Sequence, residues 1–222
     1  MTNALIRSAS FGALATMTAA AAGAQIKSVE DAVEQSTPIV DFRLRYENAD
    51  EALFDNAANA ITARLRLGFE TGELFGTKFL VEFEHIEDFL DDFNSTINGN
   101  TEFPIIADPS STELNRIQLS NTSLPDTKIT AGRQVINLDD QRFVGDFDFR
   151  QNQQTFDALR VENSSFFGIS ANAIYLNQAN RVFGEDSQFG RFEGDSVLLN
   201  AGGEIPFGRL TGFVYLIDIE EA

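Results

Sequence analysis

From Pro38 onward, apolar and charged residues alternate one by one, and this period of two constrains the fold more than any other feature of the 222-residue chain. Residues 40–47 read Val, Asp, Phe, Arg, Leu, Arg, Tyr, Glu, and residues 61–70 and 78–84 follow the same pattern. Successive side chains of a β-strand point to opposite faces. Each stretch is therefore predicted to be a strand with one apolar and one charged face.

Six further stretches are predicted as strands, which gives about nine strands of about 8–11 residues, close to the length that crosses a bilayer at a tilt. They are residues 114–121, 128–135, 155–162, 167–176, 196–204 and 210–219. Their connections alternate in length. Short turns lie at 71–77, 122–127, 163–166 and 205–209, and longer links at 48–60, 87–113, 136–154 and 177–195. This alternation is typical of an all-β, antiparallel up-and-down transmembrane β-barrel, whereas a soluble sandwich mixes hairpins with crossovers.

Five arginines fall on the charged face of these strands. An arginine at the bilayer midplane on the lipid face costs about 2–4 kcal/mol, so these side chains are predicted to point into a lumen. Two interpretations stay open there: a ladder of ion pairs with Glu47, Glu70, Glu82 and Glu84, and a positive constriction that selects anions. The five are Arg43, Arg45, Arg64, Arg66 and Arg116.

Composition excludes several classes of function. A net charge of -18 argues against a nucleic-acid-binding protein. The absence of cysteine removes disulfides, thiol nucleophiles and cysteine zinc sites. His85 is the one histidine, and no Ser-His-Asp set, HExxH motif or Gly-rich phosphate loop is present. The pairs Asp91–Asp92 and Asp139–Asp140 could act as the acid and base of a glycosidase, but acidic residues occur throughout the loops, so no enzyme, cofactor or metal site is expected. Calcium binding by the loop carboxylates stays open.

The first 24 residues are predicted to be a secretory signal peptide. Arg7 supplies the positive start, residues 11–22 are small, apolar and too short to span a bilayer, and Ala22–Gly23–Ala24 forms the cleavage site. The alternative, an N-terminal helix of a cytosolic protein, lacks a polar face. The chain then divides into a signal peptide at 1–24, a linker at 25–37 and a partial barrel at 38–222, with the Gram-negative outer membrane as the expected location.

The stretch from Gly132 to Arg160 carries a distinctive polar motif. It contains Gly132–Arg133–Gln134, Asn137 with Asp139 and Asp140, Arg142 to Gly145, Arg150–Gln151, and Thr155 to Ala158. This run resembles the middle region of the alginate-export-type outer-membrane porins. The resemblance implies an arginine-rich conduit for an anionic uronate polymer. Arg133, Arg142, Arg150 and Asp157 match the motif, Asp139 and Asp140 are its acidic partners, and alternation places Arg160 in the same conduit.

Nine strands cannot close a bacterial barrel, because single chains use an even number. Since members of the family are longer, the chain is expected to be the N-terminal half of such a barrel; the alternative is a short protein that pairs with another copy. The expected partners are outer-membrane lipid, lipopolysaccharide and a polar or anionic solute, with the oligomeric state open. The rival function is a secreted or surface β-rich protein that binds carbohydrate without a pore.

Overall fold

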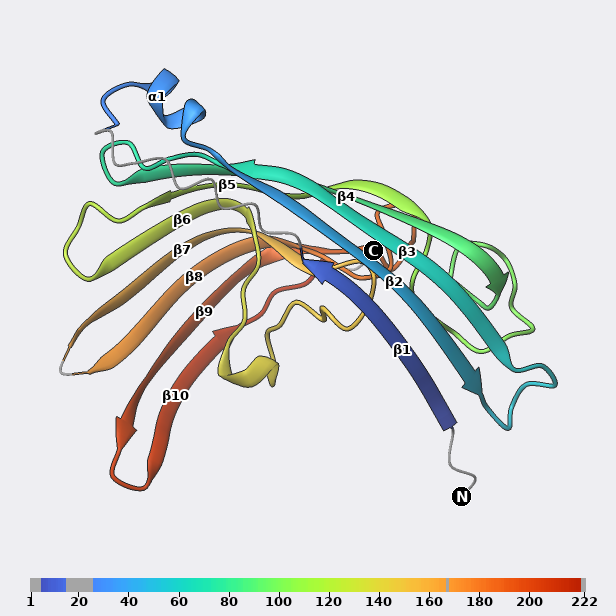
Figure 1. Ribbon diagram of the computed structural model, residues 1–222. Helices are drawn as coiled ribbons and strands as arrows, with labels where there is room; N and C mark the ends of the chain where they lie inside the picture. Colours follow the sequence, from blue (N-terminus) through green and yellow to red (C-terminus); the bar gives the residue numbers. More distant parts are fainter. Residues whose placement is uncertain (1–4, 15–25, 167, 221–222) are drawn as a thin grey trace.

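The chain folds into one large antiparallel sheet in which the strand order follows the chain order (Figure 1). The computed structural model describes residues 5–14, 26–166 and 168–220. Strands β2 to β10 correspond to the nine predicted strands, so the all-β, up-and-down arrangement is confirmed. The strands are β1 (Leu5–Leu14), β2 (Thr37–Asp50), β3 (Ala58–Glu70), β4 (Thr77–Asp92), β5 (Ser111–Asn121), β6 (Thr127–Gln134), β7 (Thr155–Phe166), β8 (Ile169–Asn180), β9 (Arg191–Ile205) and β10 (Gly208–Leu216).

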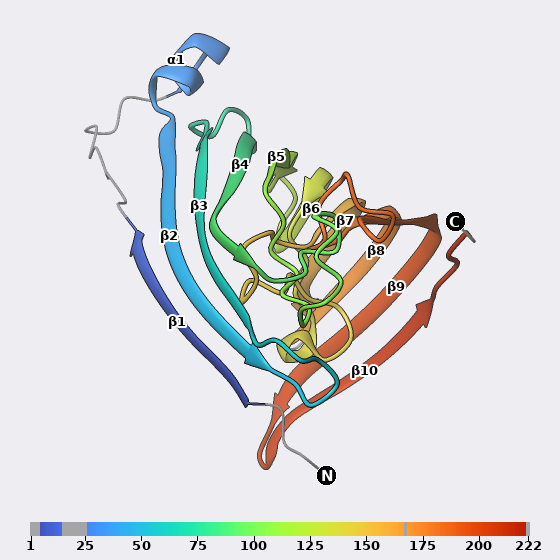
Figure 2. The same cartoon turned by 90° about the vertical axis from the view of Figure 1, so that its right-hand side faces the viewer.

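The sheet curls into a trough. Figure 2 shows β1 to β4 along one side, β8 to β10 along the other, and irregular segments between the two walls. The strand order begins with β1 and ends with β10, so the sheet is open over the described residues.

From β4 onward the connections alternate between long and short, as predicted, with longer segments after β4, β6 and β8 and short turns after β5, β7 and β9. The predicted long link at 48–60 is shorter in the structure, because β2 and β3 extend into it; residues 51–57 join these strands, and residues 71–76 join β3 to β4. The β3–β4 turn is a two-residue hairpin in which Leu74 and Thr77 exchange two backbone hydrogen bonds of 2.9 Å. Its central residues, Phe75 and Gly76, have φ of 50° and 73°, the left-handed values that such a turn requires. Because neighbouring strands are antiparallel, the connections after β2, β4, β6 and β8 all lie at one end of the trough.

A short helix, α1 (Val29–Glu34), lies within the predicted linker. Ser28 and Asp31 form a capping box, in which the Asp31 N–H donates to Ser28 Oγ and the Ser28 N–H donates to Asp31 Oδ2, both at 3.1 Å. Donation from the Lys27 and Ser28 backbones holds the pKa of Asp31 below its usual value. No helix in the described part of the chain is long and apolar enough to cross a membrane.

Strand β1 falls within the predicted signal peptide and pairs with β2 along its whole length. The cleavage motif Ala22–Gly23–Ala24 lies outside the described residues, and the signal peptide stays a prediction. Removal of residues 1–24 would leave β2 as the edge strand.

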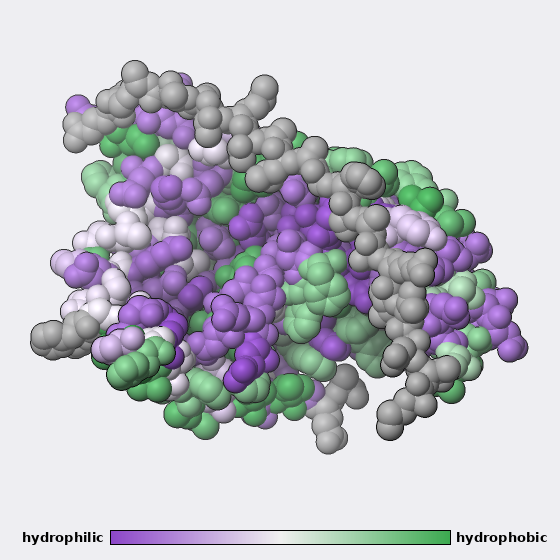
Figure 3. Space-filling model, turned by 60° about the horizontal axis from the view of Figure 1, so that its bottom comes forward, coloured by the Kyte–Doolittle hydropathy of each residue, from purple (hydrophilic) through white to green (hydrophobic). Residues whose placement is uncertain are grey.

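The two faces of the sheet differ in chemistry. On β2, Val40, Phe42 and Leu44 point away from the trough and are exposed, while Arg45, which follows Leu44, points inward and is buried. Figure 3 looks into the concave side, where hydrophilic residues dominate the middle. The same outward apolar pattern continues around the sheet, at Tyr46, Leu67, Phe83, Ile117, Leu119, Leu159, Tyr175, Val197, Leu199, Val214 and Leu216.

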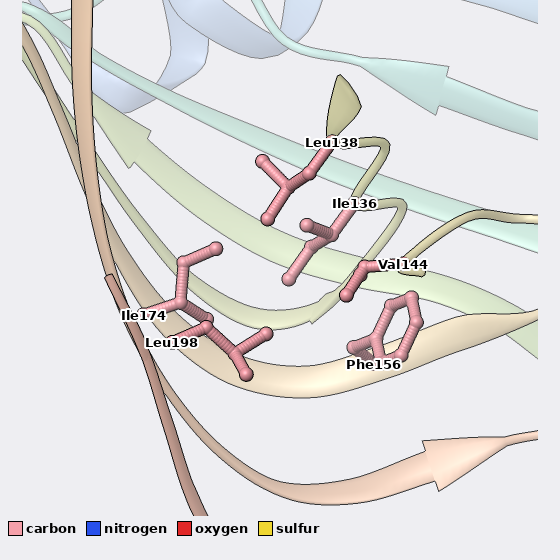
Figure 4. Close-up of a cluster of buried hydrophobic side chains, with 6 residues drawn as sticks. All are labelled: Ile136, Leu138, Val144, Phe156, Ile174 and Leu198. Carbon is pink, nitrogen blue, oxygen red and sulfur yellow. The ribbon is translucent and has the colours of Figure 1, made fainter. Parts of the chain in front are cut away.

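Two apolar clusters attach the long connections to the concave face. In the first, Ile136, Leu138 and Val144 of the β6–β7 connection pack on Phe156, Ile174 and Leu198 of β7, β8 and β9 (Figure 4). In the second, Phe93 and Ile106 of the β4–β5 connection pack on Ala49, Ala58 and Ala60. The trough is thus filled near its middle by folded loops.

Candidate functional site

The inward arginines of β2 and β3 form the centre of the site. Period-two alternation places Arg45, Arg64 and Arg66 on the concave face, where their exposed fractions are 5%, 3% and 7%. Arg43, on the same face, is part-buried. Arginine is rarely buried unless it is paired, so the surroundings of each guanidinium group decide what the site does.

Carboxylates pair with three of these four arginines, and for Arg64 and Arg66 they come from neighbouring strands. Arg66 Nε lies 2.5 Å from Glu84 Oε2, and Arg64 Nη2 lies 2.5 Å from Asp41 Oδ1. On β5, Arg116 bonds both oxygens of Glu82, at 2.9 and 2.6 Å. Arg45 contacts Glu47 on its own strand and Asp108 from the β4–β5 connection. The cross-strand ladder is therefore present, with Glu47, Glu82 and Glu84 in the positions that alternation indicates, and Glu70 paired instead with Lys78.

The β6–β7 connection covers this ladder from inside the trough. Asp148 Oδ1 receives hydrogen bonds from Arg64 Nη1 and Arg66 Nη1, at 3.2 and 3.4 Å. Gln151 is fully buried, and its amide donates to the carbonyl and the hydroxyl of Thr62, at 2.9 and 2.8 Å. The connection thus rests on β2 and β3 through polar contacts and on β7 to β9 through the apolar cluster.

Arg43 differs from the other arginines of this face. Its guanidinium donates to Gln151 Oε1 at 2.8 Å, to the Asp148 carbonyl at 2.6 Å and to the Arg150 carbonyl. Within the described residues, no carboxylate lies within ion-pair distance of it. Carbonyl and amide oxygens orient the group without neutralising its charge, so Arg43 remains a net positive centre at the concave face.

The arginines of the motif stretch are spread along the wall. Arg150 contacts Glu47 at 3.3 Å and so joins the central ladder. Arg160 bonds Asn172 at 2.9 and 2.7 Å and Glu162 at 2.8 Å. Arg142 is exposed and, with Arg160, lines a polar cavity of about 710 Å³. The structure does not gather these residues at a single point.

Arg133 and Asp157 pair with each other, at 2.7 and 3.0 Å, and Arg133 also donates to the Leu114 carbonyl. The register sets Arg133 opposite the exposed Ile117, and paired residues share a face of the sheet. The register therefore places this pair on the same face as Ile117, the convex one, away from the central ladder. Its contacts tie β5, β6 and β7 together.

The acidic partners Asp139 and Asp140 lie in the β6–β7 connection, with Gln141, as η1 (Asp139–Gln141). All three have left-handed φ, of 51°, 54° and 61°, a conformation that costs each non-glycine residue about 1–2 kcal/mol. Asp139 Oδ2 accepts a hydrogen bond of 2.6 Å from Asn200 Nδ2, and this bond fixes the turn to the inner face of β9.

Two features of the site have no counterpart in the expectations from sequence. One is the apolar surface of Phe156, Ile174 and Leu198 on which the β6–β7 connection packs. The continuous apolar run from Val197 to Leu199 could have indicated this surface, because it supplies apolar side chains to both faces of the sheet. The other is an aromatic cavity where the long connections meet. Over the described ranges, no group of three or more His, Cys, Asp or Glu is placed to hold a metal ion.

Comparison with known proteins gave no further guide. The chain matches no family model, no curated protein and no solved structure.

Proposed function

We propose that this chain forms part of an outer-membrane β-barrel porin, similar to the alginate-export family, that lets polar and anionic solutes diffuse passively across the Gram-negative outer membrane. The proposed role involves no chemical step and no cofactor.

The observation that carries this proposal is the two-faced sheet. Val40, Phe42, Leu44, Leu67 and Leu199 are all exposed on the convex face, while the concave face holds the charged ladder. Monomeric soluble proteins rarely expose contiguous apolar patches above a few hundred Å². Acyl chains outside and water inside would match both faces. The alternation of short and long connections supports the same role.

An open sheet is not a finished barrel. Unpaired backbone groups in lipid cost several kcal/mol each, so the edge strands need partners. The proposal therefore includes further strands, from the same polypeptide or from another copy, that pair with β10 and with the opposite edge.

The geometry also suggests how charge selection would work. Arg64, Arg66 and Arg116 are neutralised by carboxylates, so they stabilise the wall and hold the β6–β7 connection. Arg43, without a carboxylate partner in the described residues, would supply the positive potential on the concave face, where it contacts the β6–β7 connection. The ladder and the constriction would then be two parts of one arrangement.

Membrane insertion is tested by heat modifiability. A folded barrel shifts its gel mobility on boiling and partitions with the outer membrane, and a secreted carbohydrate-binding protein does neither. Absence of both properties would favour that rival function.

Selectivity is tested by conductance in planar bilayers, with reversal potentials measured across a salt gradient. We expect Arg43→Gln to lower the preference for anions, because it removes the unpaired charge. Lys128→Gln is the matched control, since Lys128 is exposed near a short turn, 4.0 Å from Glu162. An anion preference that Arg43→Gln leaves unchanged would remove the constriction from the proposal.

A further inference from the structure

The aromatic cavity lies on the concave side where three long connections meet. Its volume is about 550 Å³, within the range of about 300–1,000 Å³ typical of small-molecule sites. The β6–β7 connection contributes Phe143 and Phe149, the β8–β9 connection contributes Phe183, and the strands contribute Phe156 and Phe192. Several of these rings, Phe149 among them, are exposed, so solutes can reach the aromatic wall.

Two arginines line this wall, and they differ in pairing: Arg150 forms an ion pair with Glu47 at 3.3 Å, whereas Arg181 is held by rings. The guanidinium carbon of Arg181 lies 4.1 Å from the ring centroid of Phe192 and 4.7 Å from that of Phe183. Its Nη1 donates to the Phe189 carbonyl at 3.0 Å. In the part of the chain that the structure describes, no carboxylate lies within 4.0 Å of Arg181, although Glu193 and Asp218 also line the cavity.

Unlike Arg181, the neighbouring Arg191 has a carboxylate partner. It begins β9, at the other end of the same connection, is about half exposed and pairs with Glu185 at 3.6 Å. Arg181 is instead held by rings and a carbonyl, and burial lowers the pKa of its guanidinium, which nevertheless stays protonated in proteins. It therefore presents a charge with free donors beside an apolar surface.

We propose that this cavity binds small aromatic carboxylates. A phenyl ring would pack edge-on or offset against the phenylalanines, and its carboxylate would accept charge-assisted hydrogen bonds from Arg181. A sugar acid would suit the cavity less well, because hydroxyl groups against apolar walls lose hydrogen bonds to water. This inference rests on the proposed function, since it names the solute class that the channel loads at its loop end.

The test is a ¹⁹F NMR titration of 4-fluorobenzoate against the whole chain in a non-ionic maltoside detergent. Three probes separate the contributions of ring and charge. We expect 4-fluorobenzoate to bind at least about tenfold more tightly than fluoroacetate, which lacks the ring, and than 4-fluorobenzyl alcohol, which lacks the charge. Equal affinity for the three probes, or no binding at all, would overturn the proposal, and this comparison requires no variant.

Variants then locate the site. Arg181→Gln is expected to weaken 4-fluorobenzoate binding at least about tenfold, and Arg191→Gln to change it less than about twofold, because Arg191 is an exposed, paired arginine. Equal effects of the two substitutions would place binding elsewhere and contradict the inference.

The titration does not depend on membrane insertion. If the chain inserts and conducts ions but 4-fluorobenzoate does not bind, the cavity inference fails and the porin proposal stands. If the probe binds but the chain neither shifts on boiling nor partitions with the outer membrane, the porin proposal fails instead.

Discussion

At the scale of single residues, the pair of Arg66 and Glu84 shows how the concave face is stabilised. Glu84 has 2% of its surface exposed, receives a hydrogen bond of 2.5 Å from Arg66 Nε, and accepts another from the Gln153 backbone. We expect Arg66→Met to destabilise the fold by about 3 kcal/mol, because the substitution removes the hydrogen-bonded counter-charge of a buried carboxylate and leaves it only Arg64 Nε, at 4.0 Å. Urea unfolding of the lipid-embedded protein measures this loss.

The matched control is Lys78→Met. Lys78 and Glu70 form an ion pair of 2.8 Å in the same sheet, but both side chains are about one third or more exposed. Exposed pairs contribute about 0–1 kcal/mol, so this substitution should barely change the free energy of unfolding. Similar losses in the two variants would mean that the ladder is hydrated rather than buried.

Alternation predicted the direction of Arg43, Arg45, Arg64 and Arg66, because strand geometry alone fixes the face on which a side chain lies. It did not predict Asp148 and Gln151 as their partners. Those two residues come from a connection far along the chain, and their contacts depend on how that connection folds back over the sheet.

At the scale of elements, the centres of the strands were predictable and some of their ends were not. The predicted β4 core ended at Glu84, whereas the strand continues to Asp92. The last residues of β4 pair with β3, where Asn59 is opposite Asp92. Backbone hydrogen bonds make this strand pairing, so the pairing persists where the side chains are acidic and the alternation is lost. For the same reason β9 begins at Arg191 rather than at the predicted Ser196.

The β6–β7 connection is the element whose position matters most for conduction. Replacing Ile136 and Val144 together with serine should detach the connection from β7, β8 and β9. Both residues lie in the buried cluster, and burial of one such side chain stabilises by about 1.5–3 kcal/mol. We expect proteolysis within residues 135–154 to speed up at least about tenfold, together with a higher single-channel conductance.

Leu124→Ser is the control for this variant, since Leu124 is exposed in the short β5–β6 turn. The protease sensitivity of the connection and the conductance should both stay at their original values. A serine pair that leaves both properties unchanged would show that polar contacts alone hold the connection.

At the scale of the whole molecule, the account depends on which solvent meets each face of the sheet. The chain contains no cysteine, so a single introduced cysteine carries a unique label. Phe42, Leu44, Leu65 and Leu67 represent the convex face of β2 and β3. Asn172 and Thr211 represent the concave face, where both line the polar cavity and neither belongs to the buried ladder.

The most direct measurement is the quenching of a fluorophore at each of these six positions by nitroxide-labelled lipids, in vesicles that contain the protein. We predict strong quenching at 42, 44, 65 and 67, and weak quenching at 172 and 211, where a water-soluble quencher should act instead. Equal protection of both sets from the lipid quencher would contradict the account, because it would place the apolar face inside a protein interior.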